Sequence, residues 1–143
     1  MNDLNEVLNL NLKEISIYEI DEEKLITLKN CDYYLKNNFY FWLINKIHNL
    51  ENKGLYKELA YAHYLMSYYI FIVLTPLSYE ELSFYHVQKA LDYDDDIEYK
   101  EWLLIFSTLP MPLLNTYDAL EIAEEVLKHK KNSTLATTIL KIF

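Results

Sequence analysis

Apolar residues recur every three or four positions along most of the chain, which is the spacing of one face of an α-helix. The first long stretch of this kind runs from residue 21 to residue 50. Three acidic residues open it, where a helix dipole favours negative charge, and Gly54 follows it, where glycine commonly ends a helix. The pattern predicts helical structure over residues 21–50, and Asn37-Asn38 is the point at which we expect this stretch to divide.

Five further helices are predicted in the rest of the chain. Residues 59–77 carry no formal charge, but tyrosines, a histidine and a serine lie among them, so we expect a buried central helix and no membrane span. Prolines and a run of aspartates separate the later helices. The expected helices cover about residues 55–74, 78–93, 98–109 and 117–130, followed by a short one that ends at Phe143.

The first twenty residues fit this description less well, because residues 15–20 alternate between apolar and polar as a strand does. No second strand is evident to pair with them. Two interpretations stay open for residues 1–20, an extended or peripheral lead-in and part of a short helix.

Composition supports helices over strands. The chain has one glycine and three prolines in 143 residues, whereas an all-β protein needs many turns that glycine usually supplies. The length suits one domain, here taken as residues 1–143. The expected fold is therefore all-α, with antiparallel helical hairpins that form either a closed bundle or a short solenoid.

Two of the expected helices match each other at an offset of 36 residues. Ser83, Val87 and Ala90 correspond to Ala119, Ala123 and Val126, which places small residues on one face of each helix. Together with the stretches 79–92 and 117–127, this pattern resembles the second helix of tetratricopeptide repeats. The resemblance covers about residues 55–143 and implies helical hairpins that bind other proteins. The first-helix signature of that family is largely absent, and an antiparallel bundle with accidental similarity is the alternative.

Charge is concentrated in one part of the sequence. The net charge is −9, and all 13 basic residues are lysines. Residues 78–125 alone contain 12 acidic residues against two lysines, a net of −10. Because nucleic-acid binding depends on basic residues that neutralise phosphates, we expect no nucleic-acid partner. A basic protein is the expected partner, since surfaces of opposite charge associate faster.

The acidic part of the chain also contains several tyrosines, which suit recognition surfaces because they combine a large contact area with a polar tip. We therefore predict an aromatic-acidic block as the partner-binding surface. The alternatives are a solvated turn for the acids and helix packing for the tyrosines. The predicted block consists of Tyr79, Tyr85, Asp92, Tyr93, Asp94, Asp95, Asp96, Glu98, Tyr99 and Glu101.

The sequence contains no motif for catalysis or for a cofactor. Counted from Asp92, a calcium loop would need glycine at residue 97 and glutamate at residue 103, where isoleucine and leucine stand. The four histidines lack zinc-site spacing. Among them we expect His63 to be a hydrogen-bonded core residue and both His86 and His129 to be exposed. We expect no catalytic residue, no metal site and no cofactor.

Two further features of the sequence indicate the cellular compartment of the protein. Cys31 is the single cysteine, which excludes an intrachain disulfide and favours a reducing compartment. The first six residues have neither the basic nor the apolar segment of a secretory signal. We expect a cytoplasmic protein.

Three functional classes are compatible with these features. The leading one is a small cytoplasmic inhibitor of a basic, nuclease-like toxin domain, because the chain is similar in general character to small acidic bacterial immunity proteins. The second is a tetratricopeptide-like adaptor or chaperone that binds a peptide, which asparagines and lysines in a groove would favour. An enzyme or metal protein is the third.

Overall fold

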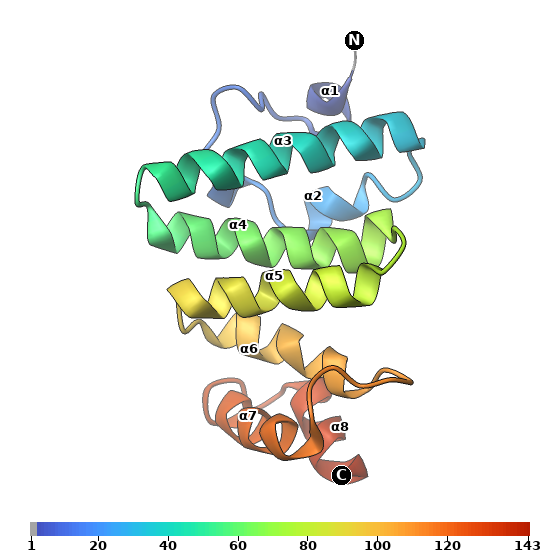
Figure 1. Ribbon diagram of the computed structural model, residues 1–143, viewed down its shortest axis with the longest axis vertical. Helices are drawn as coiled ribbons and strands as arrows, with labels where there is room; N and C mark the ends of the chain where they lie inside the picture. Colours follow the sequence, from blue (N-terminus) through green and yellow to red (C-terminus); the bar gives the residue numbers. More distant parts are fainter. Residues whose placement is uncertain (1–2) are drawn as a thin grey trace. The chain divides into compact units, whose positions relative to one another are not determined.

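The computed structural model describes residues 3–143, and within this range it contains helices and no β-strand (Figure 1). The all-α prediction is therefore confirmed. The contacts divide the chain into two compact units, of which the first ends at Tyr93 and the second is Asp94–Phe143. Whether the two units form one cooperative domain stays a prediction.

The first unit contains three long helices that run antiparallel and side by side, with shorter segments before them (Figure 1). Its elements are α1 (Leu4–Leu8), a 3₁₀ turn (Ile17–Glu19), α2 (Glu22–Ile26), α3 (Tyr33–Asn52), α4 (Tyr56–Tyr68), a π-helical turn (Tyr69–Leu74) and α5 (Tyr79–Tyr93).

The predicted stretch 21–50 does divide into two helices, but at a different point from the one expected. The break covers residues 27–32, and Asn37-Asn38 lie inside the continuous helix α3. Asp32 begins this helix as its N-cap, because its carboxylate accepts a hydrogen bond from the backbone N–H of Leu35 at 3.1 Å. Burial of Phe39 and Leu43 outweighs the modest helix propensity of two asparagines.

Gly54 ends α3 as predicted. Its φ of 67° lies in the left-handed region that glycine adopts without strain. The N–H of Gly54 donates to the carbonyl of Glu51 at 3.1 Å, and the N–H of Leu55 donates to the carbonyl of Leu50 at 3.1 Å. These two hydrogen bonds form a Schellman motif, which satisfies the last carbonyl groups of the helix.

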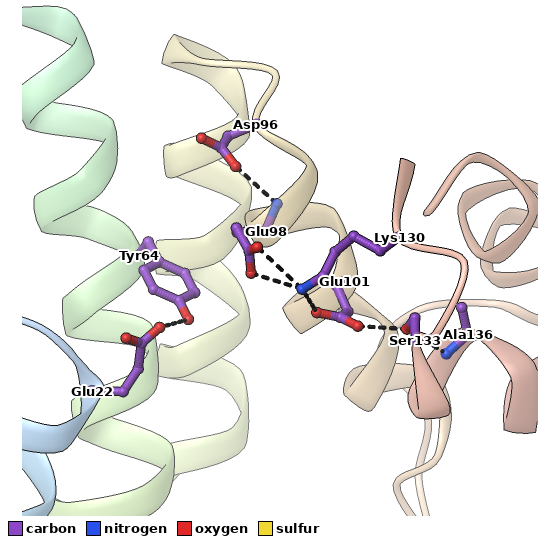
Figure 2. A network of polar contacts seen from close by, with 8 residues as sticks. All are labelled: Glu22, Tyr64, Asp96, Glu98, Glu101, Lys130, Ser133 and Ala136. Atoms are coloured by element: carbon purple, nitrogen blue, oxygen red, sulfur yellow. Dashed lines mark hydrogen bonds and ion pairs between the residues drawn. The ribbon is translucent and has the colours of Figure 1, made fainter. Parts of the chain in front are cut away.

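The first twenty residues include short helices, and they contribute to the core. Leu8, Ile17 and Ile20 are fully buried, so the part of this segment that the structure describes is not peripheral. Tyr61 of α4 donates a hydrogen bond to the carbonyl of Ile20 at 2.5 Å. Further on, the hydroxyl of Tyr64 donates to Glu22 of α2 (Figure 2).

Helices α4 and α5 approach each other closely through two buried serines. Ser67 donates to the carbonyl of Ser83 at 2.7 Å, and Ser83 donates to the carbonyl of Ser67 at 2.6 Å. Small side chains allow this approach, and the reciprocal bonds satisfy hydroxyl groups that water cannot reach. The face of α5 predicted from the repeat is indeed buried, since Ser83, Val87 and Ala90 are inaccessible.

The second unit consists of α6 (Ile97–Leu103), a 3₁₀ turn (Leu104–Ser107), α7 (Thr116–His129) and α8 (Thr134–Ile142). The predicted small face of α7 is buried at Ala119, Ala123 and Val126. In α8, Ala136 and Ile139 are buried as well, and the core of the unit also contains Leu104 and Phe106.

Over residues 3–143, no helix combines the length and the apolar character required to cross a membrane.

Candidate functional site

The ten residues of the predicted aromatic-acidic block fall in two different units. Tyr79, Tyr85, Asp92 and Tyr93 belong to α5 of the first unit. The other six, from Asp94 to Glu101, belong to the second unit. We therefore describe each group within its own unit.

On α5, only part of the predicted block is open to a partner. Tyr85 is 52% exposed and Asp92 is exposed. Tyr79 is half-buried, with its ring centroid 5.3 Å from that of Phe71. Tyr93 is half-buried too and stacks on Tyr56 at 5.4 Å between ring centroids. Helix packing, the alternative considered for the tyrosines, thus accounts for two of the three on this helix.

In the second unit, two lysines form ion pairs with three of the five predicted acids. Lys130 donates to Glu98 at 3.0 Å and to Glu101 at 2.6 Å, and Ser133 also donates to Glu101 (Figure 2). Asp95 pairs with Lys100 at 2.8 Å. Asp94 and Asp96 are the two of these five acids without an ion pair among the described residues.

These ion pairs also shift the pKa values of Lys130 and Glu101. Hydrogen bonds from Lys130 to Glu101 and Glu98 outweigh burial and raise the pKa of that lysine. Burial opposes ionisation of Glu101, but hydrogen bonds from Lys130 and Ser133 exceed it and lower the pKa of the carboxyl group. The network links α6 to the start of α8, so its main effect is on the structure of the unit.

The remaining members of the predicted block have different surroundings. Asp96 caps α6, where its carboxylate accepts from the N–H of Glu98 at 2.8 Å (Figure 2). Asp94 is half-buried and has no ion-pair partner among the described residues. Tyr99 is only 4% exposed, because it lies on the same face of α6 as the buried Leu103, so its ring does not reach a surface.

A second candidate site is a cleft of about 320 Å³ in the first unit, between α3, α4 and α5. At its base two histidines pair directly, with 2.9 Å between Nδ1 of His63 and Nδ1 of His86. One ring must donate and the other accept, so both cannot be protonated in this arrangement. The other lining residues are Ile44, Ile47, His48, Glu51, Tyr85, Lys89 and Tyr93.

The histidine pair is nearly inaccessible, with His63 7% and His86 8% exposed. Burial, with a smaller contribution from Lys89 that Asp92 partly offsets, lowers the pKa of His63 to about 4. Burial and the neighbouring His63 lower the pKa of His86 to about 3. Both rings are therefore neutral at pH 7.

The prediction for His63 is confirmed, whereas the prediction that His86 is exposed is wrong. His86 lies three residues after Ser83 and four before Ala90, so it belongs to the buried face of α5. His129 is exposed as expected. No group of three or more metal-binding side chains occurs among residues 3–143.

The third candidate is a groove that sequence analysis did not identify, along the side of α3 that faces the N-terminal segment. Its cavity has a volume of about 730 Å³. The lining residues are Leu4, Asn5, Leu12, Lys13, Asn38, Phe41, Trp42, Asn45, Lys46 and Asn49. We call this cavity the α3 groove.

Two hydrogen bonds hold the wall of the α3 groove opposite the helix. The indole N–H of Trp42 donates to the carbonyl of Leu12 at 3.2 Å. The backbone N–H of the same leucine donates to the side-chain oxygen of Asn5 at 3.0 Å. A smaller hollow of about 370 Å³ shares Leu4, Asn5, Lys13 and Asn38 with the groove and extends it toward Tyr34.

The surface of the α3 groove combines apolar and polar groups. Phe41 is 65% exposed, which is unusual for a phenylalanine in a folded unit. Asn38, Asn45 and Asn49 follow one another at intervals of seven and four residues, so they share a face of α3. Their amides make no hydrogen bond within the described part of the chain. The same spacing was visible in the sequence, but Asn38 was interpreted there as a helix break.

No protein-family model matches this chain, and neither a similar curated protein nor a similar solved structure was found. The tetratricopeptide resemblance and the similarity to immunity proteins therefore stay predictions. Function must be argued from the sites themselves.

Proposed function

We propose that this chain binds another protein without catalysis, and that the α3 groove holds a segment of the partner. The observation that carries the proposal is the exposed aromatic ring of Phe41 in a groove of about 730 Å³. A volume of that size lies within the range of ligand-binding cavities. Exposed aromatic residues are enriched at the centres of protein interfaces.

The lining of the α3 groove supports a peptide as the bound group. Peptide segments present alternating N–H and C=O groups, and an asparagine amide can pair with either. Three such amides are available along the groove. This is the adaptor-like function that asparagines and lysines in a groove favour.

The second candidate function is a cytoplasmic inhibitor that neutralises a basic toxin domain through the aromatic-acidic block. Tyr85 and Asp92 favour it, since both are exposed on α5. The ion pairs of Glu98 and Glu101 with Lys130 count against it, because a partner would have to compete with lysines of this chain.

Site-specific photocrosslinking distinguishes the two functions. We would replace Phe41, Tyr85 or Tyr117 individually by p-benzoylphenylalanine, express each variant in the native host, irradiate, and identify adducts by mass spectrometry. Tyr117 is the control, because it is 73% exposed and lies in neither candidate surface. We expect one discrete protein adduct at position 41 whose crosslinked peptides come from a single segment.

The other outcomes are equally informative. An adduct at position 85 without one at position 41 would transfer the function to the aromatic-acidic block. The same adducts at all three positions would indicate non-specific contact. Absence of any adduct at both 41 and 85 would contradict the proposal of a protein-binding function.

A further inference from the structure

We infer that the segment bound in the α3 groove is extended and acidic. The inference rests on the proposed function and adds the chemistry of the partner to it. Both lysines that line the groove, Lys13 and Lys46, have no ion pair among residues 3–143. None of the ten residues that line the cavity is acidic.

This local charge is opposite to that of the rest of the chain. The whole chain has a net charge of −9, with 22 acidic residues against 13 lysines. A cavity lined by two lysines and no acid is therefore a local positive site on a negative protein. The adjoining hollow includes one acidic side chain, Asp3, which is 5% exposed and does not line the α3 groove itself. Charge complementarity selects carboxylate groups for the occupant.

The arrangement of the amides indicates the conformation of the occupant. Asn38 and Asn49 lie eleven residues apart on α3, which corresponds to about 16 Å at roughly 1.5 Å per residue. An extended peptide covers that distance with about five residues at ~3.3 Å each. A helix would satisfy its own backbone groups and leave the asparagine amides without partners.

The lining residues also favour a peptide over a nucleic acid. Single-stranded nucleic acid carries one phosphate per nucleotide, and proteins that bind it track the backbone with a continuous basic groove. Two lysines on a protein with 22 acidic residues do not form such a groove. A segment with one or two carboxylates among neutral residues matches two lysines.

The inference can be tested with a phage-displayed library of random 12-residue peptides, selected on the full-length protein at low salt. We would compare the wild type with the double variant Lys13→Glu/Lys46→Glu. The matched control is Lys29→Glu/Lys57→Glu, which changes the net charge equally at exposed lysines outside the groove. Circular dichroism establishes that all three proteins are folded.

We expect the wild type and the control to enrich aspartate and glutamate. The groove variant should lose that preference and enrich lysine instead. A synthetic peptide from the wild-type pool should bind the groove variant at least about tenfold more weakly, because two favourable charge pairs become repulsive. Its affinity for the wild type should fall at 0.5 M salt, where exposed charges are screened.

Several results would overturn the inference, and they separate it from the proposed function. A peptide pool without acidic enrichment whose binding Phe41→Ala abolishes would contradict the acidic occupant but keep the peptide-binding groove. If no peptide were enriched, both the acidic occupant and the peptide-binding function of the groove would be contradicted. Tighter binding of a 12-nucleotide single-stranded DNA, lost in the groove variant, would assign the groove to nucleic acid. A dimer that the groove variant disrupts would assign it to a second copy of this chain.

Discussion

The pairing of His63 with His86 joins two titratable rings in the interior of the first unit, at 2.9 Å between their Nδ1 atoms. The groups around the pair are Lys89, Asp92, His48 and Glu51, together with the rings of Tyr85 and Tyr93. Neither histidine has an acidic hydrogen-bond partner among the described residues. The pair therefore has little to stabilise a positive charge, and protonation of both rings requires the pair to separate.

This arrangement predicts a specific dependence of stability on pH. Both histidines have a lower pKa in the folded protein, about 4 and about 3, than the ordinary value of 6.5. The unfolded chain thus binds more protons below pH 6.5, and stability that is present above that pH is lost as the pH falls. Between pH 7 and pH 5, before most carboxyl groups titrate, the loss should be about 2 kcal/mol per histidine.

Urea unfolding between pH 5 and pH 7 measures this effect. His86→Asn retains a group that can hydrogen-bond to His63 but removes one titrating ring, so the free energy of unfolding should vary about half as much over this range. His129→Asn is the control, because His129 is exposed in the second unit. Equal pH dependence in the wild type and in His86→Asn would show that the pair does not have the lowered pKa values described.

Sequence alone could not place the histidine pair, because its members are 23 residues apart and belong to different helices. The burial of His86 could be predicted from the sequence, since its position relative to Ser83 and Ala90 is that of a core residue. Its pairing with His63 could not be predicted, because that pairing depends on the relative rotation and shift of α4 and α5. The reciprocal bonds of Ser67 and Ser83 help to set that relation.

At the scale of elements, local signals predicted most helices correctly and failed where two signals competed. Helix α5 ends at Tyr93 as expected, and α7 differs from its predicted range of 117–130 by one residue at each end. The alternation of residues 15–20 suggested a strand, whereas Ser16 and Glu19 form a capping box that begins a 3₁₀ turn. The spacing of that serine and glutamate was the informative signal.

Helix ends give a second prediction, because three of them use the left-handed conformation with different residues, namely Asn9, Gly54 and Thr75. Gly54 has φ of 67°, and Thr75, which ends the π-helical turn, has φ of 41°. The conformation costs glycine nothing, but it strains a β-branched residue. A Cβ atom at position 54 would have only the hydroxyl of Tyr56 nearby, at 4.0 Å, so backbone strain is the cost there.

Gly54→Ala should therefore lower the free energy of unfolding by about 1 kcal/mol, and Thr75→Gly should raise it by about 0.5–1 kcal/mol. Chemical denaturation followed by circular dichroism measures both. Thr27→Gly is the control, because Thr27 ends α2 in the right-handed conformation and donates to the carbonyl of Lys24 at 2.6 Å, so this variant should be destabilised. Stabilisation of Thr27→Gly to the same extent as Thr75→Gly would contradict the explanation by backbone strain.

At the scale of the whole molecule, composition predicted the fold class but not the α3 groove. One glycine and the apolar periodicity were sufficient for an all-α protein. The number of acidic residues in 78–125 predicted a binding surface there. The ion pairs of Lys100 with Asp95 and of Lys130 with Glu101 cannot be predicted from such a count. The α3 groove depends on residues from α1, from the segment after it and from α3, which only the tertiary fold brings together.

The prediction of one domain over residues 1–143 can be tested directly, because each unit contains one tryptophan. Trp42 belongs to the first unit and Trp102 to the second. Trp102→Phe leaves fluorescence that reports only on the first unit, and Trp42→Phe leaves fluorescence that reports only on the second. The second unit has only 50 residues, and helical units of that size bury too little surface to be more than marginally stable alone.

We therefore expect both single-tryptophan variants to unfold in urea with transitions that coincide with their own circular dichroism curves, as a two-state protein requires. Either substitution can shift the midpoint of the whole protein, so the comparison is made within each variant and not between them. If fluorescence and circular dichroism separate within one variant, the chain unfolds in more than one step. In that case Tyr93 and Asp94 mark a boundary between two independently folding units, and the prediction of a single cooperative domain is wrong.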